Sequence, residues 1–206
     1  MEKYPSKYFE AAVREFSRLP GVGSRSALRM VLQLLKRQSK EIEIFGTVLK
    51  DLASHISYCK TCHNICESEQ CDICADKKRD QTIICVVEDI RDVMAIENTG
   101  QYRGLYHLLG GVINPMEGTS PTDLNIDSLL SRANSGQTEE IIMALRTTME
   151  GDTTVFYLYK KLKDVNVKIS NIARGVSIGG ELEYADEITL GRSIINRTLY
   201  ENEFAG

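Results

Sequence analysis

Four cysteines form two closely spaced pairs, and this pattern limits what the middle of the chain can fold into more than any other feature. The pairs are Cys59-x-x-Cys62 and Cys71-x-x-Cys74, with eight residues between them. Each pair turns the backbone so that both sulfur atoms face one point, and four thiolates complete a closed tetrahedral zinc site. We predict one structural Zn²⁺ ion per chain, bound by these four cysteines.

Two alternatives exist: a redox-active Cys-x-x-Cys pair, and thiols that only pack in the interior. A segment of about sixteen residues with few apolar side chains cannot fold by burial alone, and this favours the metal. His63 and Cys66 lie between the pairs but belong to neither. Cys85 lies in an apolar run, so we expect a buried thiol there.

The composition is that of a folded chain without a membrane span. Of 206 residues, 42% are hydrophobic and 26% are charged, so the chain has enough apolar surface for a substantial core. No run approaches the roughly 18 apolar residues that a membrane span requires. The start of the chain lacks the continuous apolar stretch of a secretory signal. We therefore expect a cytoplasmic protein whose cysteines are not disulfides.

Charge is distributed unevenly along the chain. Residues 1–40 carry a net charge of +6 and residues 41–206 a net charge of −10, although the whole chain has only −4. This asymmetry predicts a basic contact surface on an acidic body, suited to nucleic acid. The alternative is chance clustering of lysine and arginine on a solvated helix face.

The basic segment also contains a glycine-rich turn between two expected helices. Helical periodicity begins after a predicted N-cap at Ser6, stops at residues 19–23 and resumes near Ser24; Leu28, Val31, Leu32 and Leu35 are expected to be its buried face. A third helix is expected after Ser39, with an apolar stripe of Ile42, Phe45, Leu49, Leu52 and Ile56.

That turn and the helix after it are suited to binding phosphates. Gly21 and Gly23 allow backbone amides to approach a phosphate closely. Basic side chains follow at helical spacing and are expected to form one stripe: Arg25, Arg29, Lys36 and Lys40. Such contacts predict sequence-independent, salt-sensitive DNA binding through Gly21, Gly23, Arg25, Arg29 and Lys36. An ordinary turn between packed helices is the alternative.

From Thr82 onward, short apolar runs alternate with helical patterns. Strands are expected at 82–87, 105–109, 140–145 and 167–173, and helices at 89–98, 123–133 and 152–163. This alternation predicts an α/β domain with a mainly parallel sheet. Acidic residues follow two of the strands: Glu88, Asp89, Asp92, Glu150 and Asp152. They are interpreted either as Mg²⁺ ligands or as helix caps and first-turn charges.

Five segments in this order resemble the RecR family of bacterial recombination mediator proteins. They are Leu-Pro-Gly-Val-Gly with Ser-Ala-Leu-Arg-Met (19–30), the four-cysteine segment, Val-Val-Glu-Asp-Ile-Arg-Asp-Val (86–93), Tyr-His-Leu-Leu-Gly-Gly-Val-Ile-Asn-Pro (106–115) and Gly-Gly-Glu-Leu-Glu-Tyr-Ala-Asp (179–186). The resemblance implies a helix-hairpin-helix region (1–56), a C4 zinc finger (57–80), a Toprim domain (81–177) and a C-terminal region (178–206). Arg25 replaces a more usual lysine, Ser24 a proline and Arg174 a histidine, while Cys66 is additional.

The same resemblance implies a function. RecR-like proteins form ring-shaped clamps, here a dimer or a tetramer, that bind double- and single-stranded DNA. They act with RecO, and in some bacteria RecF, to load RecA onto single strands coated by single-strand-binding protein. The family's DNA-contacting positions correspond to Arg25 and Arg29.

A metal-dependent Toprim enzyme is the other class considered. Catalytic Toprim domains carry Asp-x-Asp where this chain has Arg146-Thr147-Thr148, so the metal site is incomplete. The resemblance therefore favours a protein that is not an enzyme. We expect Glu88, Asp92, Glu150 and Asp152 to form an acidic rim that docks a basic partner, with RecO as the expected one.

Overall fold

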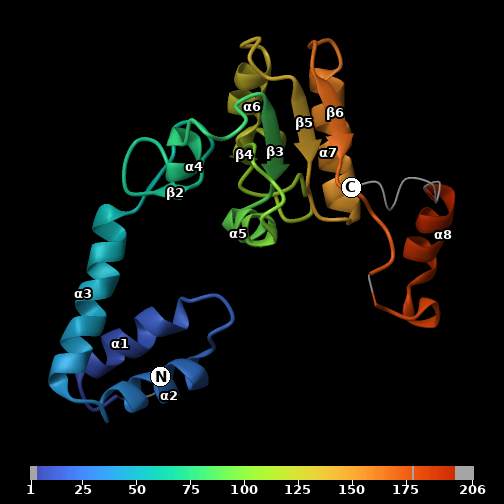
Figure 1. Ribbon diagram of the computed structural model, residues 1–206. Coiled ribbons are helices and arrows are strands. Elements are labelled where there is room, and N and C mark those ends of the chain that lie inside the picture. Colours follow the sequence, from blue (N-terminus) through green and yellow to red (C-terminus); the bar gives the residue numbers. More distant parts are fainter. Residues whose placement is uncertain (1–3, 178, 198–206) are drawn as a thin grey trace. The chain divides into compact units, whose positions relative to one another are not determined.

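The computed structural model describes residues 4–177 and 179–197, which divide into two compact units at Ile56 and Ser57 (Figure 1). The first unit contains three helices: α1 (Lys7–Ser17), α2 (Ser24–Leu34) and α3 (Ser39–His55). The second contains β1 (Ser57–Tyr58), β2 (Ile65–Cys66), α4 (Asp72–Ala75), β3 (Ile83–Val87), α5 (Ile90–Thr99), β4 (Leu105–Leu108), η1 (Pro121–Asp123), α6 (Ile126–Ala133), β5 (Glu140–Met143), α7 (Met149–Leu162), β6 (Lys168–Asn171), η2 (Leu182–Tyr184) and α8 (Glu187–Ile195).

In the first unit, α1 and α2 form a hairpin around a small apolar core. The Ser6 hydroxyl accepts a hydrogen bond from the Tyr8 amide at 3.2 Å, which confirms the predicted N-cap of α1. Val13 of α1 packs with Ala27 and Val31 of α2, and all three side chains are buried. Partly buried side chains, among them Phe9 and Phe16 of α1, pack against these three residues and complete the small core.

Two sequence predictions for this unit are wrong. Leu32 and Leu35 are exposed, because Ala27 and not these leucines shares the inner face of α2 with Val31. The expected basic stripe also does not follow one helix: α2 ends at Leu34, so Lys36 lies in the next turn and Lys40 at the start of α3.

The apolar stripe of α3 is largely solvent-exposed in the part of the chain that the structure describes. Phe45, Leu49 and Leu52 all belong to the exposed class, and Ile42 is half-buried. The stripe is where the sequence predicted it, but the described hairpin does not cover it.

The second unit is built on a four-stranded sheet in the order β4-β3-β5-β6 (Figure 1). All its strand pairs are parallel, which confirms the predicted parallel sheet. Side chains alternate along β3, so Ile84 and Val86 face one core and Cys85 and Val87 face the other. The first core contains α6 and α7 through residues such as Leu129 and Leu158, and the second contains α5 through Val93. Helices therefore cover both faces of the sheet, as parallel sheets require.

Figure 1 also shows that the connections after β3 and β5 emerge at one edge of the sheet, from which α5 and α7 begin. The expected strand ends therefore lie together, and this edge carries the acidic residues. No described helix is long and apolar enough to span a membrane.

Candidate functional site

The four paired cysteines lie together in one buried cluster. Their sulfur atoms all lie within 4.8 Å of one another, and the Cys62 and Cys71 Sγ atoms are 3.5 Å apart. Four soft sulfur donors that converge on one point fit a tetrahedral Zn²⁺ ion and leave no position open for a reacting water. The chain therefore fits one structural zinc ion, as the sequence predicted.

Local backbone structure positions each cysteine pair. The Cys59 carbonyl accepts a hydrogen bond from the His63 amide at 2.9 Å, and the Cys71 carbonyl accepts one from Ala75 at 3.0 Å. The antiparallel strands β1 and β2 hold the first pair, while Cys71 is the N-cap of the short helix α4. His63 completes the first turn in the left-handed region with φ 64°, a backbone conformation that is unfavourable for a residue with a Cβ atom.

The remaining two cysteines lie outside the cluster. The half-buried Cys66 thiol donates to the Ser68 carbonyl, with Sγ and O 2.8 Å apart. Cys85 is buried within β3, and desolvation raises the pKa of its thiol to about 12. Within the cluster, hydrogen bonds from Cys62 and Cys74 lower the pKa of Cys71, whereas the pKa of Cys62 is raised by its hydrogen bonds with Cys71 and Cys74.

The zinc-finger segment is attached to the sheet by contacts that the sequence did not reveal. The Leu108 amide of β4 donates to the Cys62 carbonyl at 2.9 Å. The His63 ring lies 2.8 Å from the Ser128 hydroxyl and packs edge-on against His107, with ring centroids 5.3 Å apart. Burial lowers the pKa of His107 to about 3, so this ring is neutral. No spacing pattern predicts a pair formed by residues of two distant segments.

The glycine turn between α1 and α2 is exposed at Gly21 and Gly23. Gly21 has φ +77°, which a residue with a side chain rarely adopts. Gly23 precedes α2 with φ −77°, and a Cβ atom there would meet nothing within 4 Å. The fold therefore does not require glycine at residue 23. Close approach of a ligand to the backbone at this position would require the absence of a side chain.

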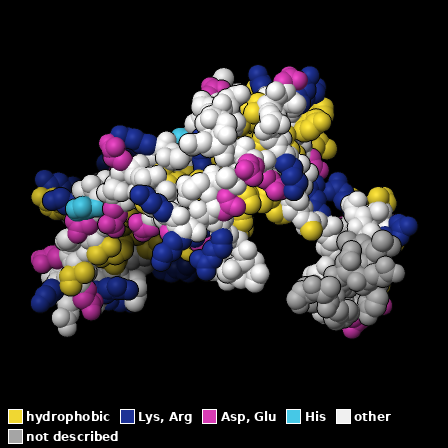
Figure 2. Space-filling model, turned by 45° about the horizontal axis from the view of Figure 1, so that its top comes forward, with side chains coloured by type: hydrophobic (Ala, Val, Ile, Leu, Met, Phe, Trp, Pro, Cys, Tyr) yellow, Lys and Arg dark blue, Asp and Glu magenta, His cyan; other side chains and the backbone are white. Residues whose placement is uncertain are grey.

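Arg25 and Arg29 extend the positive charge of this turn. Both side chains are exposed on α2, which begins without a side-chain cap in the described structure and has no acidic residue in its first turn. The uncompensated helix dipole and these arginines attract anions to the same end of the helix. Figure 2 shows Lys and Arg side chains over this unit, among acidic and hydrophobic ones.

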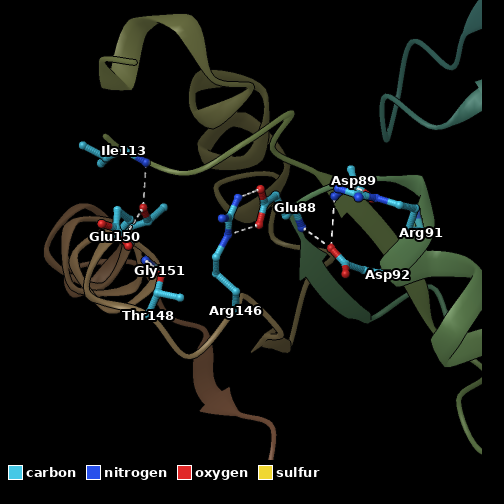
Figure 3. A network of polar contacts seen from close by, with 10 residues as sticks. Glu88, Asp89, Arg91, Asp92, Ile113, Arg146, Thr148, Glu150 and Gly151 are labelled. Atoms are coloured by element: carbon cyan, nitrogen blue, oxygen red, sulfur yellow. Dashed lines mark hydrogen bonds and ion pairs between the residues drawn. The ribbon is translucent and has the colours of Figure 1, made fainter. Parts of the chain in front are cut away.

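The expected acidic rim is mostly engaged within the chain (Figure 3). The Arg146 guanidinium binds Glu88, with Nε 2.6 Å from Oε2 and a second, shorter hydrogen bond to Oε1. The Asp92 carboxylate accepts from the amides of Glu88 and Asp89 at 3.0 and 3.1 Å and so caps α5. The helix-capping interpretation of Asp92 is therefore confirmed.

The other two carboxylates lie in the first turn of α7. Asp152 Oδ1 accepts from Arg174 at 2.6 Å, and Arg192 lies 3.6 Å from its second oxygen. Glu150 has no ion-pair partner among the described residues, and hydrogen bonds from its own backbone amide and from Thr148 lower its pKa. Glu150 is therefore the most available of the four charges.

Comparisons with known proteins agree with this architecture. Family models match four consecutive parts of the chain: the RecR helix-hairpin-helix (residues 9–53), the RecR zinc finger domain of the four-cysteine type (56–76), the Toprim domain (82–173) and the RecR C-terminal region (175–198). The order of these models is the order that the sequence resemblance implied.

Curated relatives match along nearly the whole chain. The Recombination protein RecR of Bacteroides thetaiotaomicron is 58% identical over 199 residues, or 97% of each chain. The protein of the same name from Porphyromonas gingivalis strain ATCC 33277 is 60% identical over 198 residues, or 96% of each chain. That of Flavobacterium johnsoniae is 54% identical over 202 residues, or 98% of each chain. With a helical hairpin, a four-cysteine zinc finger and a Toprim sheet in the order of the family models, and with these relatives, the chain belongs to the RecR family.

Proposed function

We propose that this protein is a non-enzymatic DNA-binding clamp in recombinational DNA repair. The open turn at Gly21 and Gly23, followed by Arg25 and Arg29, carries the proposal. Exposed backbone amides and arginines contact phosphates without reading bases, so double- and single-stranded DNA are both ligands. Lys36, in the turn after α2, adds a further positive charge to the hairpin unit.

Two observations support a role other than catalysis for the Toprim domain. Arg146 places a fixed cation on Glu88, the carboxylate that would otherwise be a metal ligand. Thr148 supplies an N-cap to α7 and not a second carboxylate. Metal-dependent phosphoryl transfer requires clustered acidic ligands, and this edge of the sheet has its acids bound to arginines and amides. We therefore propose that the Toprim domain binds partners in repair and does not catalyse a reaction.

The proposed partners follow from charge and apolar surface. The acidic rim of Glu88, Asp92, Glu150 and Asp152 is the proposed docking surface for RecO, with RecF as a further partner, and loading of RecA is the proposed outcome. Glu150 is the charge most able to meet a basic partner, because the other three are engaged. The exposed stripe of α3 supports assembly into a dimer or a ring-shaped tetramer, since a second copy would bury it.

We further propose that the protein is located in the cytoplasm, in association with the nucleoid, and that its domains are 1–56, 57–80, 81–177 and 178–206.

A ring-shaped clamp requires several copies of the chain, so the molecular mass of the protein in solution should exceed that of one chain. Sedimentation with and without DNA tests this directly, and a monomer in both states would contradict the clamp.

The central experiment is a salt series on Arg25→Ala with Arg29→Ala. Each arginine that neutralises a phosphate adds about 0.9 to the slope of log affinity against log salt on duplex DNA, so the slope should fall by about 1.8. Arg14→Ala with Lys50→Ala removes the same charge from the same unit outside the turn and α2, and should change the slope less. An unchanged slope in the first variant would place the contact elsewhere.

A further inference from the structure

The outer side of α7 carries aromatic and basic side chains that the proposed function does not use. Phe156 is 58% exposed and Tyr159 is 52% exposed, although Thr154, Leu158 and Leu162 of the same helix are buried. Side chains three or four positions apart lie on one side of a helix. The exposed side of the last turns of α7 therefore presents Phe156, Tyr159, Lys160 and Lys163. Lys161, five positions after Phe156, lies beside this group over the Tyr157 ring, and the five residues together are called here the α7 patch.

Lysines of the patch lie against aromatic rings. The Lys160 Nζ is 4.5 Å from the centroid of the Phe156 ring, and the Lys161 Nζ is 5.5 Å from that of Tyr157. Tyr157 is half-buried and packs against the main core, so it anchors its lysine on the surface. The patch thus offers rings and ammonium groups side by side.

The charge of the patch is not neutralised within the described chain. None of its three lysines forms an ion pair with a described residue. Residues 153–163 contain no aspartate or glutamate, and the exposed Asp164 that follows them forms no ion pair with a described residue. A surface with this composition is complementary to a polyanion, even though the residues from 41 onward are acidic overall.

Lysines at the end of a helix also complement the helix dipole. That explanation accounts for Lys160, Lys161 and Lys163, but it gives no reason for two exposed rings among them. Exposed rings beside cations are the combination on which the bases of single strands stack while their phosphates are neutralised. In a duplex the bases stack on one another, so the rings cannot reach their faces.

We propose that the α7 patch is a second nucleic-acid site, specific for single strands. Phe156 and Tyr159 stack on exposed bases, and the three lysines contact the phosphates on either side. This site belongs to the second unit, whereas the proposed hairpin contacts belong to the first. The two sites have different specificities: the hairpin binds any phosphate backbone, and the patch binds single strands in preference to double strands.

Binding of fluorescent oligo(dT) and of a duplex of equal length by the full chain tests the proposal. The oligonucleotide should exceed the ~4–16 nucleotides that single-strand sites of this type cover. The experiment is done in the Arg25→Ala, Arg29→Ala background, so that the hairpin does not mask the patch. Phe156→Ala with Tyr159→Ala should then lower affinity for oligo(dT) by about 25-fold or more, because each of the two lost stacking platforms costs about fivefold or more. Duplex affinity should not change.

Matched variants separate stacking from other effects. Phe156→Tyr with Tyr159→Phe keeps both rings and should retain oligo(dT) binding. Tyr184→Ala removes a 79% exposed ring of η2 that lies outside the patch and should have no effect. Lys160→Ala with Lys163→Ala should lower the salt slope for oligo(dT) by about 1.4, since each phosphate contact on a single strand adds about 0.7.

Several results would overturn the proposal. One is full oligo(dT) affinity in the variant without the two rings, and another is an equal loss of duplex binding. A complete loss of oligo(dT) binding when only Arg25 and Arg29 are changed would show that the patch binds nothing by itself. A change in sedimentation mass with unchanged oligo(dT) affinity would make the patch a protein contact. An unchanged hairpin salt slope, by contrast, would contradict the proposed function and leave the patch standing.

Discussion

The Arg146 guanidinium is bound by two hydrogen bonds to the Glu88 carboxylate, which joins the ends of β3 and β5 by an ion pair between residues 58 positions apart (Figure 3). The hydrogen bonds to Glu88 raise the pKa of Arg146, so the guanidinium stays charged. A side chain thus supplies the positive charge that a divalent ion supplies in a metal-dependent site.

Replacing this arginine should create affinity for divalent cations. Arg146→Asp removes the bound cation and places a second carboxylate beside Glu88, so Mn²⁺ binding should increase about tenfold or more over the unchanged chain. Titration followed by electron paramagnetic resonance measures it. Adding Glu88→Gln to Arg146→Asp should abolish the gain; binding that survives this second change would mean that Glu88 is not a ligand.

The zinc assignment predicts opposite results for two neighbouring cysteines. Cys71→Ser should lower zinc content to well below one ion per chain and destabilise the segment, because an oxygen replaces a thiolate in a region with little core of its own. Cys66→Ser should keep the full zinc content, since its thiol donates to a backbone carbonyl outside the cluster. Metal analysis of the purified variants decides, and zinc lost by Cys66→Ser alone would reverse the assignment.

Glycine is required at residue 151 for packing. A Cβ atom there would lie 2.0 Å from the Arg146 carbonyl oxygen, so α7 could not begin so close to the strand end. Gly151→Ala should lower the free energy of unfolding by about 1–3 kcal/mol, as overpacking does. In the control Gly46→Ala, a Cβ atom in α3 meets nothing within 4 Å. Gly46→Ala should raise the free energy of unfolding by about 0.5–1 kcal/mol, because alanine is the better helix former. The urea midpoint should therefore shift in opposite directions for the two variants.

The Arg79–Glu97 pair predicts part of the acid sensitivity. The Arg79 side chain is nearly buried and donates to Glu97, and the Tyr106 hydroxyl donates to the same carboxylate at 2.7 Å. These contacts lower the pKa of Glu97 below its ordinary value of about 4.3.

The unfolded chain therefore binds the proton more readily, and the stability from this pair is complete above about pH 5.3 and lost as pH falls through the unfolded and then the folded pKa. Glu97→Gln should cost about 2 kcal/mol at pH 7. It should also flatten the decline of the urea midpoint below pH 5. A decline as steep as that of the unchanged chain would exclude this carboxylate as its source.

The proposed acidic docking surface is best tested at Glu150. Glu150→Lys should slow association with RecO severalfold and make it less sensitive to salt, while zinc content and DNA binding stay unchanged. Asp127→Lys reverses an exposed first-turn charge on α6 and is the matched control. Asp152→Lys is less clean, because it also breaks the contacts to Arg174 and Arg192. Equal effects of Glu150→Lys and Asp127→Lys would mean that only net charge matters.

Local patterns in the sequence predicted the elements and the metal ligands well. The four cysteines, the N-cap at Ser6 and the apolar run that forms β3 each depend on neighbours within a few residues, so local patterns reveal them. Long-range contacts were beyond such patterns. The seating of His63 against Ser128 and His107, and the ion pair of Arg146 with Glu88, depend on how distant segments meet.

The errors have a common physical cause. Leu32, Leu35 and the stripe of α3 are apolar at helical spacing, so periodicity predicts that they are buried. Periodicity shows that a face is apolar but not which surface covers it, and in one chain the small hairpin core is already filled by Val13, Ala27 and Val31. The prediction of one basic stripe was wrong for Lys36 and Lys40, because α2 ends at Leu34 while the basic residues continue beyond it.

The strand order of the sheet also has consequences during synthesis on the ribosome. The strand β3 is made first but lies in the interior of the sheet, with β4 on one side and β5, more than fifty residues later in the chain, on the other. Until β5 emerges, one edge of an apolar strand remains open to pairing with other nascent chains. The time that the ribosome needs to make the residues between β3 and β5 therefore sets how long this strand edge is exposed to aggregation.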